Sequence, residues 1–192
     1  MNPQVWWFLT RASGVVAWLM LTASVIWGIV FATKAFPNQR RPLWLAAMHR
    51  WLAGLAWVFL AIHLVSLVAD SYVDFGVLDL VVPYASGWKP GAVALGVVAT
   101  WILAAVQVTS LAQRRLPRRV WRLVHLGSYA TFWLASMHAA YAGTDRSNLL
   151  YRSTAAASIV AVAWALMYRL ANRRAVRRAA RTGAPRPATT RP

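Results

Sequence analysis

Five long apolar stretches constrain this chain more than any other feature of its sequence. They cover residues 5–32, 44–69, 90–112, 119–142 and 150–171. Each has at least about 20 residues, the length of a helix that crosses a bilayer core about 30 Å thick. Such segments must be helical, because lipid offers no hydrogen bonds to the backbone. We therefore expect an all-α, polytopic membrane bundle of five transmembrane helices over residues 1–172, followed by a basic, partly disordered cytoplasmic tail over residues 173–192. Arginines recur at helical spacing from Arg173 to Arg181, so the last helix should continue into this tail, whereas Pro and Thr dominate from Gly183 onward and predict disorder.

The composition agrees with a membrane protein and excludes several kinds of chemistry. Hydrophobic residues make up 59% of the chain, and the mean hydropathy is +0.47, which is too apolar for an ordinary soluble domain of 192 residues. The chain has no cysteine. Disulfides, thiolate-bound iron–sulfur clusters and thiol catalysis are therefore excluded.

The charge of +17 is distributed in a way that predicts the topology. Basic residues gather after the first, third and fifth apolar stretches, whereas the four acids fall in the alternate loops, at Asp70, Asp74, Asp79 and Asp145. Basic loops stay on the cytoplasmic side. We expect the N-terminus outside and the C-terminus inside, in a multi-pass protein of the cell membrane. Cations that flank apolar stretches favour anionic lipid as their partner, and not nucleic acid.

Three local patterns predict the connections between these helices. Two prolines and a polar cluster predict a cytoplasmic loop over residues 36–42. The outer loop over residues 70–89 has an amphipathic middle, which predicts a short interfacial helix, either a lid over a site or a simple connection. Ser147 or Asn148 is expected to cap the last helix.

All four histidines of the chain lie inside two of the apolar stretches. His49 and His63 are fourteen positions apart in the second stretch, and His125 and His138 are thirteen apart in the fourth. An ionisable residue in a membrane span is costly and marks a functional site. The spacings correspond to about 21 and about 19.5 Å along a helix, too far for one metal ion. We therefore predict two sites at two depths, His49 with His125 near the inner face and His63 with His138 near the outer face.

The two spacings differ in how they place the rings around a helix. In an ideal helix the spacing of fourteen falls about 40° short of four turns, so His49 and His63 share a face. The spacing of thirteen falls about 140° short, so His125 and His138 need helix tilt, or a kink near Gly127 and Ser128, to reach their partners.

Two b-type haems, each held by two imidazoles, are the cofactors that this pattern favours. Bis-imidazole ligation fills both axial positions of the iron and suits electron transfer. Small residues beside the histidines leave room for a macrocycle, namely Ala53, Gly54, Gly127 and Ser128. Arg11 near the outer face and Arg50 and Arg122 near the inner face are candidates to bind the haem propionates. Anchoring of these arginines to the membrane interface is the alternative interpretation.

Two other classes of protein stay open at this point. In a haem-free carrier or assembly protein, the histidines would only form hydrogen bonds within the bundle. In a proton relay they would carry protons, although a relay usually includes an intramembrane Asp or Glu, and the apolar stretches contain none. Zinc catalysis is disfavoured, because the chain has no His-x-x-x-His pair with a nearby acid.

Several motifs resemble the ferric reductase-like transmembrane domain family, which includes the haem subunit of methionine sulfoxide reductase systems and the membrane part of NADPH oxidases. The resemblance covers about residues 5–171 and rests on five short segments: Leu9-Thr10-Arg11-Ala12-Ser13-Gly14, Met48-His49-Arg50, Ile62-His63-Leu64, Trp121-Arg122-Leu123-Val124-His125-Leu126 and Met137-His138-Ala139. It implies a bundle with two b haems that passes electrons from the cytoplasmic side, or from quinol, to an acceptor outside.

The chain also departs from that family. Many relatives have six spans and a cytoplasmic flavin and nicotinamide domain, whereas this sequence has five apolar stretches and no Gly-x-Gly-x-x-Gly motif. We expect an oxidoreductase subunit that depends on a separate electron donor, either quinol or a flavoprotein that supplies FMN or FAD. The basic inner loops either dock an acidic reductase or bind anionic lipid.

Overall fold

The computed structural model describes residues 3–33, 43–70, 73, 75–145 and 147–181, and this part of the chain is built from helices. The helices are α1 (Pro3–Ala32), α2 (Leu43–Ala69), α3 (Val77–Val81), α4 (Pro90–Leu111), α5 (Arg118–Ala142) and α6 (Leu149–Arg181). The loop predicted over residues 36–42 and the end of the tail, from residue 182, lie outside the described residues.

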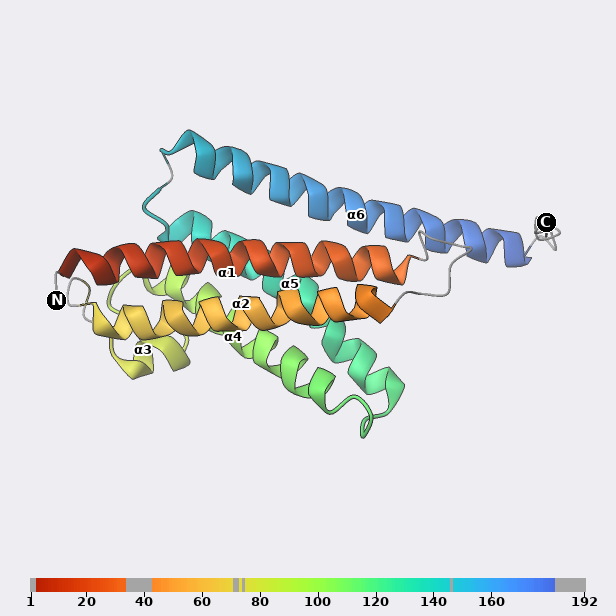
Figure 1. Cartoon of the computed structure of the whole chain (residues 1–192), viewed down its shortest axis with the longest axis horizontal. Helices are drawn as coiled ribbons and strands as arrows, with labels where there is room; N and C mark the ends of the chain where they lie inside the picture. The colour runs from red at the N-terminus through yellow and green to blue at the C-terminus, as the bar shows by residue number, and fades with distance from the viewer. Residues whose placement is uncertain (1–2, 34–42, 71–72, 74, 146, 182–192) are drawn as a thin grey trace.

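The five long helices form two antiparallel hairpins and one added helix (Figure 1). α1 lies along α2, α4 lies along α5, and these are the two closest helix pairs of the molecule. The α4/α5 hairpin is inclined to the α1/α2 hairpin, and α6 runs along the other side of α1 (Figure 1). α1 therefore has neighbours on several sides and is the central helix of the bundle.

The hydrophobic core lies where α1 meets the other helices. α1 contributes Trp18, Leu21, Val25 and Ile29, and the other helices contribute Ala56, Phe132, Val162 and Ala165. Phe132 and Val162 are 0% exposed. The indole Nε1 of Trp18 donates a hydrogen bond of 2.9 Å to Ser136 Oγ, so the one polar atom of this core tryptophan is satisfied.

Four described helices are long and apolar enough to cross a membrane: Gln4–Ala32, Trp44–Ala69, Pro90–Leu111 and Leu149–Asn172. α5 has a similar length of 25 residues, but it begins with three arginines in its first five residues and carries two histidines, which lowers its hydropathy. Large apolar side chains point outward, for example Trp51 at 71% and Trp164 at 69% exposure. Such a surface suits lipid and not water, and the chain is a multi-pass membrane protein.

Short capping interactions organise the end of the bundle that carries Asp70, Asp79 and Asp145. α3 confirms the short helix predicted within residues 70–89, and the carboxylate of Asp79 accepts a 2.8 Å hydrogen bond from the backbone of Gly76. The side chain of Asn148 accepts hydrogen bonds from the backbone N–H groups of Leu150 and Tyr151, at 2.9 and 3.3 Å, which confirms the predicted cap of α6. α6 continues past residue 172 to Arg181, so the start of the predicted tail is helical.

Candidate functional site

The structure brings the four histidines together as two pairs, each with one ring from α2 and one from α5. The ring centres of His49 and His125 are 6.0 Å apart, and those of His63 and His138 are 6.5 Å apart. The two rings of each pair are steeply inclined, at 69° and 78°. α5 is one continuous helix through Gly127 and Ser128, and the α4/α5 hairpin to which it belongs is inclined to the α1/α2 hairpin (Figure 1).

Three of the four imidazoles are oriented by a backbone carbonyl of the neighbouring helix. His63 Nδ1 lies 2.8 Å from the carbonyl oxygen of Thr10, His138 Nδ1 lies 2.8 Å from that of Ala92, and His49 Nδ1 lies 3.1 Å from that of Ser24. A carbonyl oxygen can only accept, so Nδ1 must carry the hydrogen in these three rings. Nε2 then keeps its lone pair and is available as a ligand for a metal.

His125 is held differently from the other three histidines. Its Nδ1 lies 3.3 Å from the hydroxyl oxygen of Ser110 on α4. The indole of Trp121 stacks on its ring, with 5.1 Å between the centres and 27° between the planes. The Trp121 Nε1 is buried and has no hydrogen-bond partner in the part of the chain that the structure describes.

Glycines make room for the three carbonyl-bonded rings. Thr10, Ser24 and Ala92 each precede a glycine by four positions, so that one turn later Gly14, Gly28 and Gly96 lie against the imidazoles. A Cβ atom at these glycines would lie 2.9 Å from His63 Nδ1, 3.3 Å from His49 Cε1 and 2.8 Å from His138 Nδ1. Helical glycine is costly, and here its lack of a side chain lets each ring reach the backbone.

Sequence reasoning missed these three glycines, although their spacing gave a signal. Gly14 and Gly28 are fourteen positions apart in α1, as His49 and His63 are in α2. A Cβ at Gly127 would lie 3.0 Å from Ile102 Cγ2, so this glycine lets α5 approach α4. A Cβ at Gly54 would meet nothing within 4 Å.

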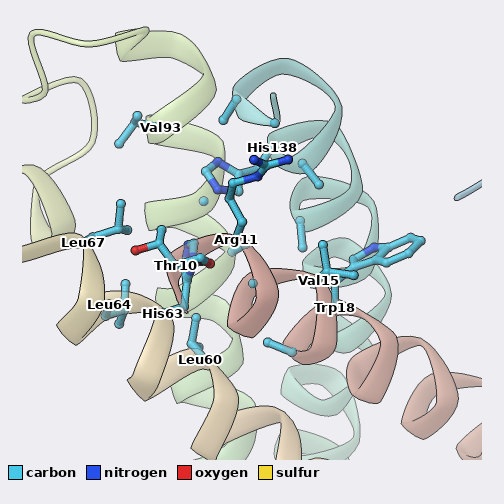
Figure 2. Close-up of a pocket in the computed structure, with 18 of the residues that line it drawn as sticks. Thr10, Arg11, Val15, Trp18, Leu60, His63, Leu64, Leu67, Val93 and His138 are labelled. Carbon is cyan, nitrogen blue, oxygen red and sulfur yellow. Dashed lines mark hydrogen bonds between the residues drawn. The ribbon is translucent and has the colours of Figure 1, made fainter. Parts of the chain in front are cut away.

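A cavity of about 270 Å³ lies between the hairpins around the His63/His138 pair. Both histidines, Gly14, Gly96 and Arg11 line it. Figure 2 shows the side chains of His63, His138 and Arg11 around this space, with Thr10 beside His63. The walls are mostly apolar, which suits a flat, largely hydrophobic group with a few polar edges.

The predicted arginines occupy different surroundings. Arg11 lies at the cavity and forms an ion pair with Asp145, in which its Nε donates a 2.9 Å hydrogen bond, and its guanidinium lies 4.0 Å from the centre of the Trp7 indole. Sequence reasoning did not identify Asp145 as its partner. Arg50 and Arg122 are exposed.

The donor set fits a metal group that brings most of its own ligands. A metal–nitrogen bond is about 2 Å long, and the centre of an imidazole ring lies about 1 Å beyond its nitrogen. Two imidazoles that bind one metal from opposite sides therefore have ring centres about 6 Å apart. The observed 6.0 and 6.5 Å agree with this value. Among the described residues no group of three or more His, Cys, Asp or Glu side chains could hold a bare metal ion. Each pair can thus supply two axial nitrogens and little else.

These features define a helical membrane protein with two histidine pairs at two levels along α2 and α5, between the two helical hairpins. A family model described as the ferric reductase like transmembrane component matches residues 13–137, about two thirds of the chain. The chain belongs to this family. The match includes His49, His63 and His125 and ends one residue before His138. Comparisons with curated proteins and with solved structures give no match.

Proposed function

We propose that the chain is a membrane cytochrome b that moves electrons across the bilayer through two b-type haems. His49 and His125 would hold one haem, and His63 and His138 the other. The observation that carries the proposal is the geometry of the two pairs, with ring centres 6.0 and 6.5 Å apart. Membership of the ferric reductase-like family supports transmembrane electron transfer as the activity.

The haem, when bound, supplies the one-electron redox chemistry, and the protein binds and orients it. Two histidines that hold one haem iron would favour electron transfer over oxygen binding. The hydrogen bonds from Nδ1 to the carbonyls of Thr10, Ser24 and Ala92 hold three of the rings in the tautomer that ligation needs.

The proposed path crosses the membrane from inside to outside. The spacing from His49 to His63 corresponds to about 21 Å along α2. Between these levels Ala56 and Phe132 pack in the same buried cluster, so protein and not water separates the two sites. In this proposal α5 is the fifth span, the N-terminus lies outside, and the protein belongs to the cell membrane.

The electron donor and acceptor would be separate molecules. The sequence has no nicotinamide-binding glycine motif, so quinol or a flavoprotein carrying FMN or FAD would reduce the haem at His49 and His125. The haem at His63 and His138 would reduce a molecule or protein outside. The chain would then act as an oxidoreductase subunit.

Reduced-minus-oxidised spectra and the haem-to-protein ratio of the purified chain test this proposal. We expect a b-type spectrum and about two haems per chain. His63→Ala should remove one haem and leave the other, while Ser153→Ala, an exposed position on α6, should keep both. A wild-type protein without a b-type spectrum, or a His63→Ala variant with two haems, would refute the proposal and favour the haem-free alternatives.

A further inference from the structure

Arg169 of α6 is a half-buried cation beside the His49/His125 pair. Its Nη1 donates a hydrogen bond to the hydroxyl of Tyr129 on α5, and its guanidinium carbon lies 5.9 Å from the centre of that ring. Tyr129 follows His125 by four positions, so both side chains leave α5 on the same face. The Arg169 charge lies close enough to His125 to interact with that ring electrostatically.

Among the described residues, no acidic side chain lies beside this charge. The sequence has four acids, at Asp70, Asp74, Asp79 and Asp145. The three that the structure describes, Asp70, Asp79 and Asp145, belong to the connections at the opposite end of the bundle. The Tyr129 hydroxyl accepts a hydrogen bond from the guanidinium and orients it, but it is not a carboxylate or a phosphate. A cation held in an apolar bundle is costly unless an anion accompanies it. Arg169 therefore indicates an anion that the protein does not itself provide.

The direction of the Arg169 side chain supports the same conclusion. An arginine near the end of a membrane span normally extends to the headgroups, as the exposed Arg50 and Arg122 are free to do. Arg169 instead reaches Tyr129, which is about 16 Å along α5 from its first residue. The buried, unpartnered Nε1 of Trp121 on the other side of His125 is a second polar donor at this pair, among the residues that the structure describes.

We propose that Arg169, oriented by Tyr129, binds a propionate carboxylate of the haem held by His49 and His125. This inference rests on the proposed function and adds a residue of α6, which lies outside the family match over residues 13–137. A guanidinium and a carboxylate form a strong charge-assisted pair. Because oxidised haem carries one more positive charge than reduced haem, a nearby cation favours the reduced form and raises the midpoint potential of this haem.

A redox titration of the full chain tests this role without measuring electron transfer to any acceptor. The titration is made in the His63→Ala background, so that only the haem of the His49/His125 pair contributes. At a fixed potential, Arg169→Gln should raise the ratio of oxidised to reduced haem about tenfold. This change corresponds to a midpoint potential that is lower by about 59 mV for a one-electron couple. Arg169→Lys, which keeps the charge, should retain most of the parent potential. Arg174→Gln removes an exposed arginine from the same helix and should change nothing.

A second arm identifies the anion. The same proteins are reconstituted with haem whose propionates are methyl esters, and the rate of haem release in detergent is compared. Arg169→Gln should release ordinary haem several-fold faster than the parent protein, and this difference should disappear with the ester, because the ester lacks the carboxylate that Arg169 binds. If the difference persists with the ester, or if Arg169→Gln and Arg174→Gln titrate alike, the proposal is wrong, and an anionic lipid headgroup becomes the partner of Arg169. If Arg169→Gln is not recovered, Tyr129→Phe replaces it. A smaller shift in the same direction, together with faster release of ordinary haem but not of the ester, supports the proposal, and no shift overturns it. Absence of haem from the parent protein would instead refute the proposed function.

Discussion

Gly96→Ala is a small change that tests how the protein holds the His63/His138 site. The new Cβ would lie 2.8, 2.9 and 3.1 Å from Nδ1, Cε1 and Cγ of His138. Carbon atoms pack at about 3.5–4.0 Å, so the ring must move by roughly 0.7–1 Å. That movement would stretch or break the 2.8 Å hydrogen bond from His138 Nδ1 to the carbonyl of Ala92.

The expected cost of this substitution combines three terms. Overpacking costs about 1–3 kcal/mol, and loss of one hydrogen bond costs about 0.5–1.5 kcal/mol. Alanine is the better helix former and recovers about 1 kcal/mol. The net destabilisation is therefore about 0.5–3.5 kcal/mol. The displaced imidazole should also bind its haem poorly, since metal–nitrogen bonds of about 2 Å tolerate little error.

The assay compares Gly96→Ala with Gly91→Ala, a matched change in the same helix. A Cβ at Gly91 would meet nothing within 4 Å. We expect Gly91→Ala to retain about two haems per chain and at least wild-type stability, and Gly96→Ala to fall toward one haem and a lower unfolding temperature in detergent. Equal haem content and equal stability in the two variants would refute the argument that Gly96 exists to admit the His138 ring.

Two further predictions address the core and the topology. Phe132→Ala should lower the unfolding free energy by about 3–5 kcal/mol, because Phe132 is 0% exposed. Trp164→Ala should lower it far less, because that side chain is 69% exposed. Similar losses in both variants would contradict the assigned core. The chain has no cysteine, so single cysteines at Arg115 and Asn148 can be labelled selectively with an impermeant maleimide. If α5 crosses the membrane, intact cells should label position 148 and not position 115, and labelling of both would show that α5 is not a span.

The apolar stretches predicted the long helices closely, because length and hydrophobicity are local properties of a sequence. The segment predicted to begin at residue 44 begins at Leu43, and the one predicted to end at residue 112 ends at Leu111. The arginines at helical spacing also predicted that the last helix continues beyond its apolar stretch, and α6 extends to Arg181. A hydrophobic pattern marks where a helix leaves the lipid and not where it stops.

The partners of the site residues could not be predicted in the same way, because they depend on how helices pack. Arg11 pairs with Asp145, at a sequence separation of 134, and Arg169 reaches Tyr129 across a separation of 40. Neither contact follows from local periodicity. The relation of Gly14 and Gly28 to His63 and His49 required the register of α1 against α2, which the sequence suggests only through two equal spacings.

The register of the two hairpins also explains why His125 differs from the other histidines. In the α1/α2 hairpin the two glycines and the two histidines have the same spacing of fourteen, so antiparallel packing repeats one hydrogen-bond geometry at both levels. In the α4/α5 hairpin the histidines are thirteen positions apart, whereas Gly96 and Ser110 are fourteen apart. His138 Nδ1 therefore lies at the carbonyl oxygen of Ala92 beside Gly96, whereas His125 Nδ1 lies 3.3 Å from the hydroxyl oxygen of Ser110. A hydroxyl can donate or accept, so it does not impose a tautomer as a carbonyl does, and the stacked indole of Trp121 restrains the ring in its place.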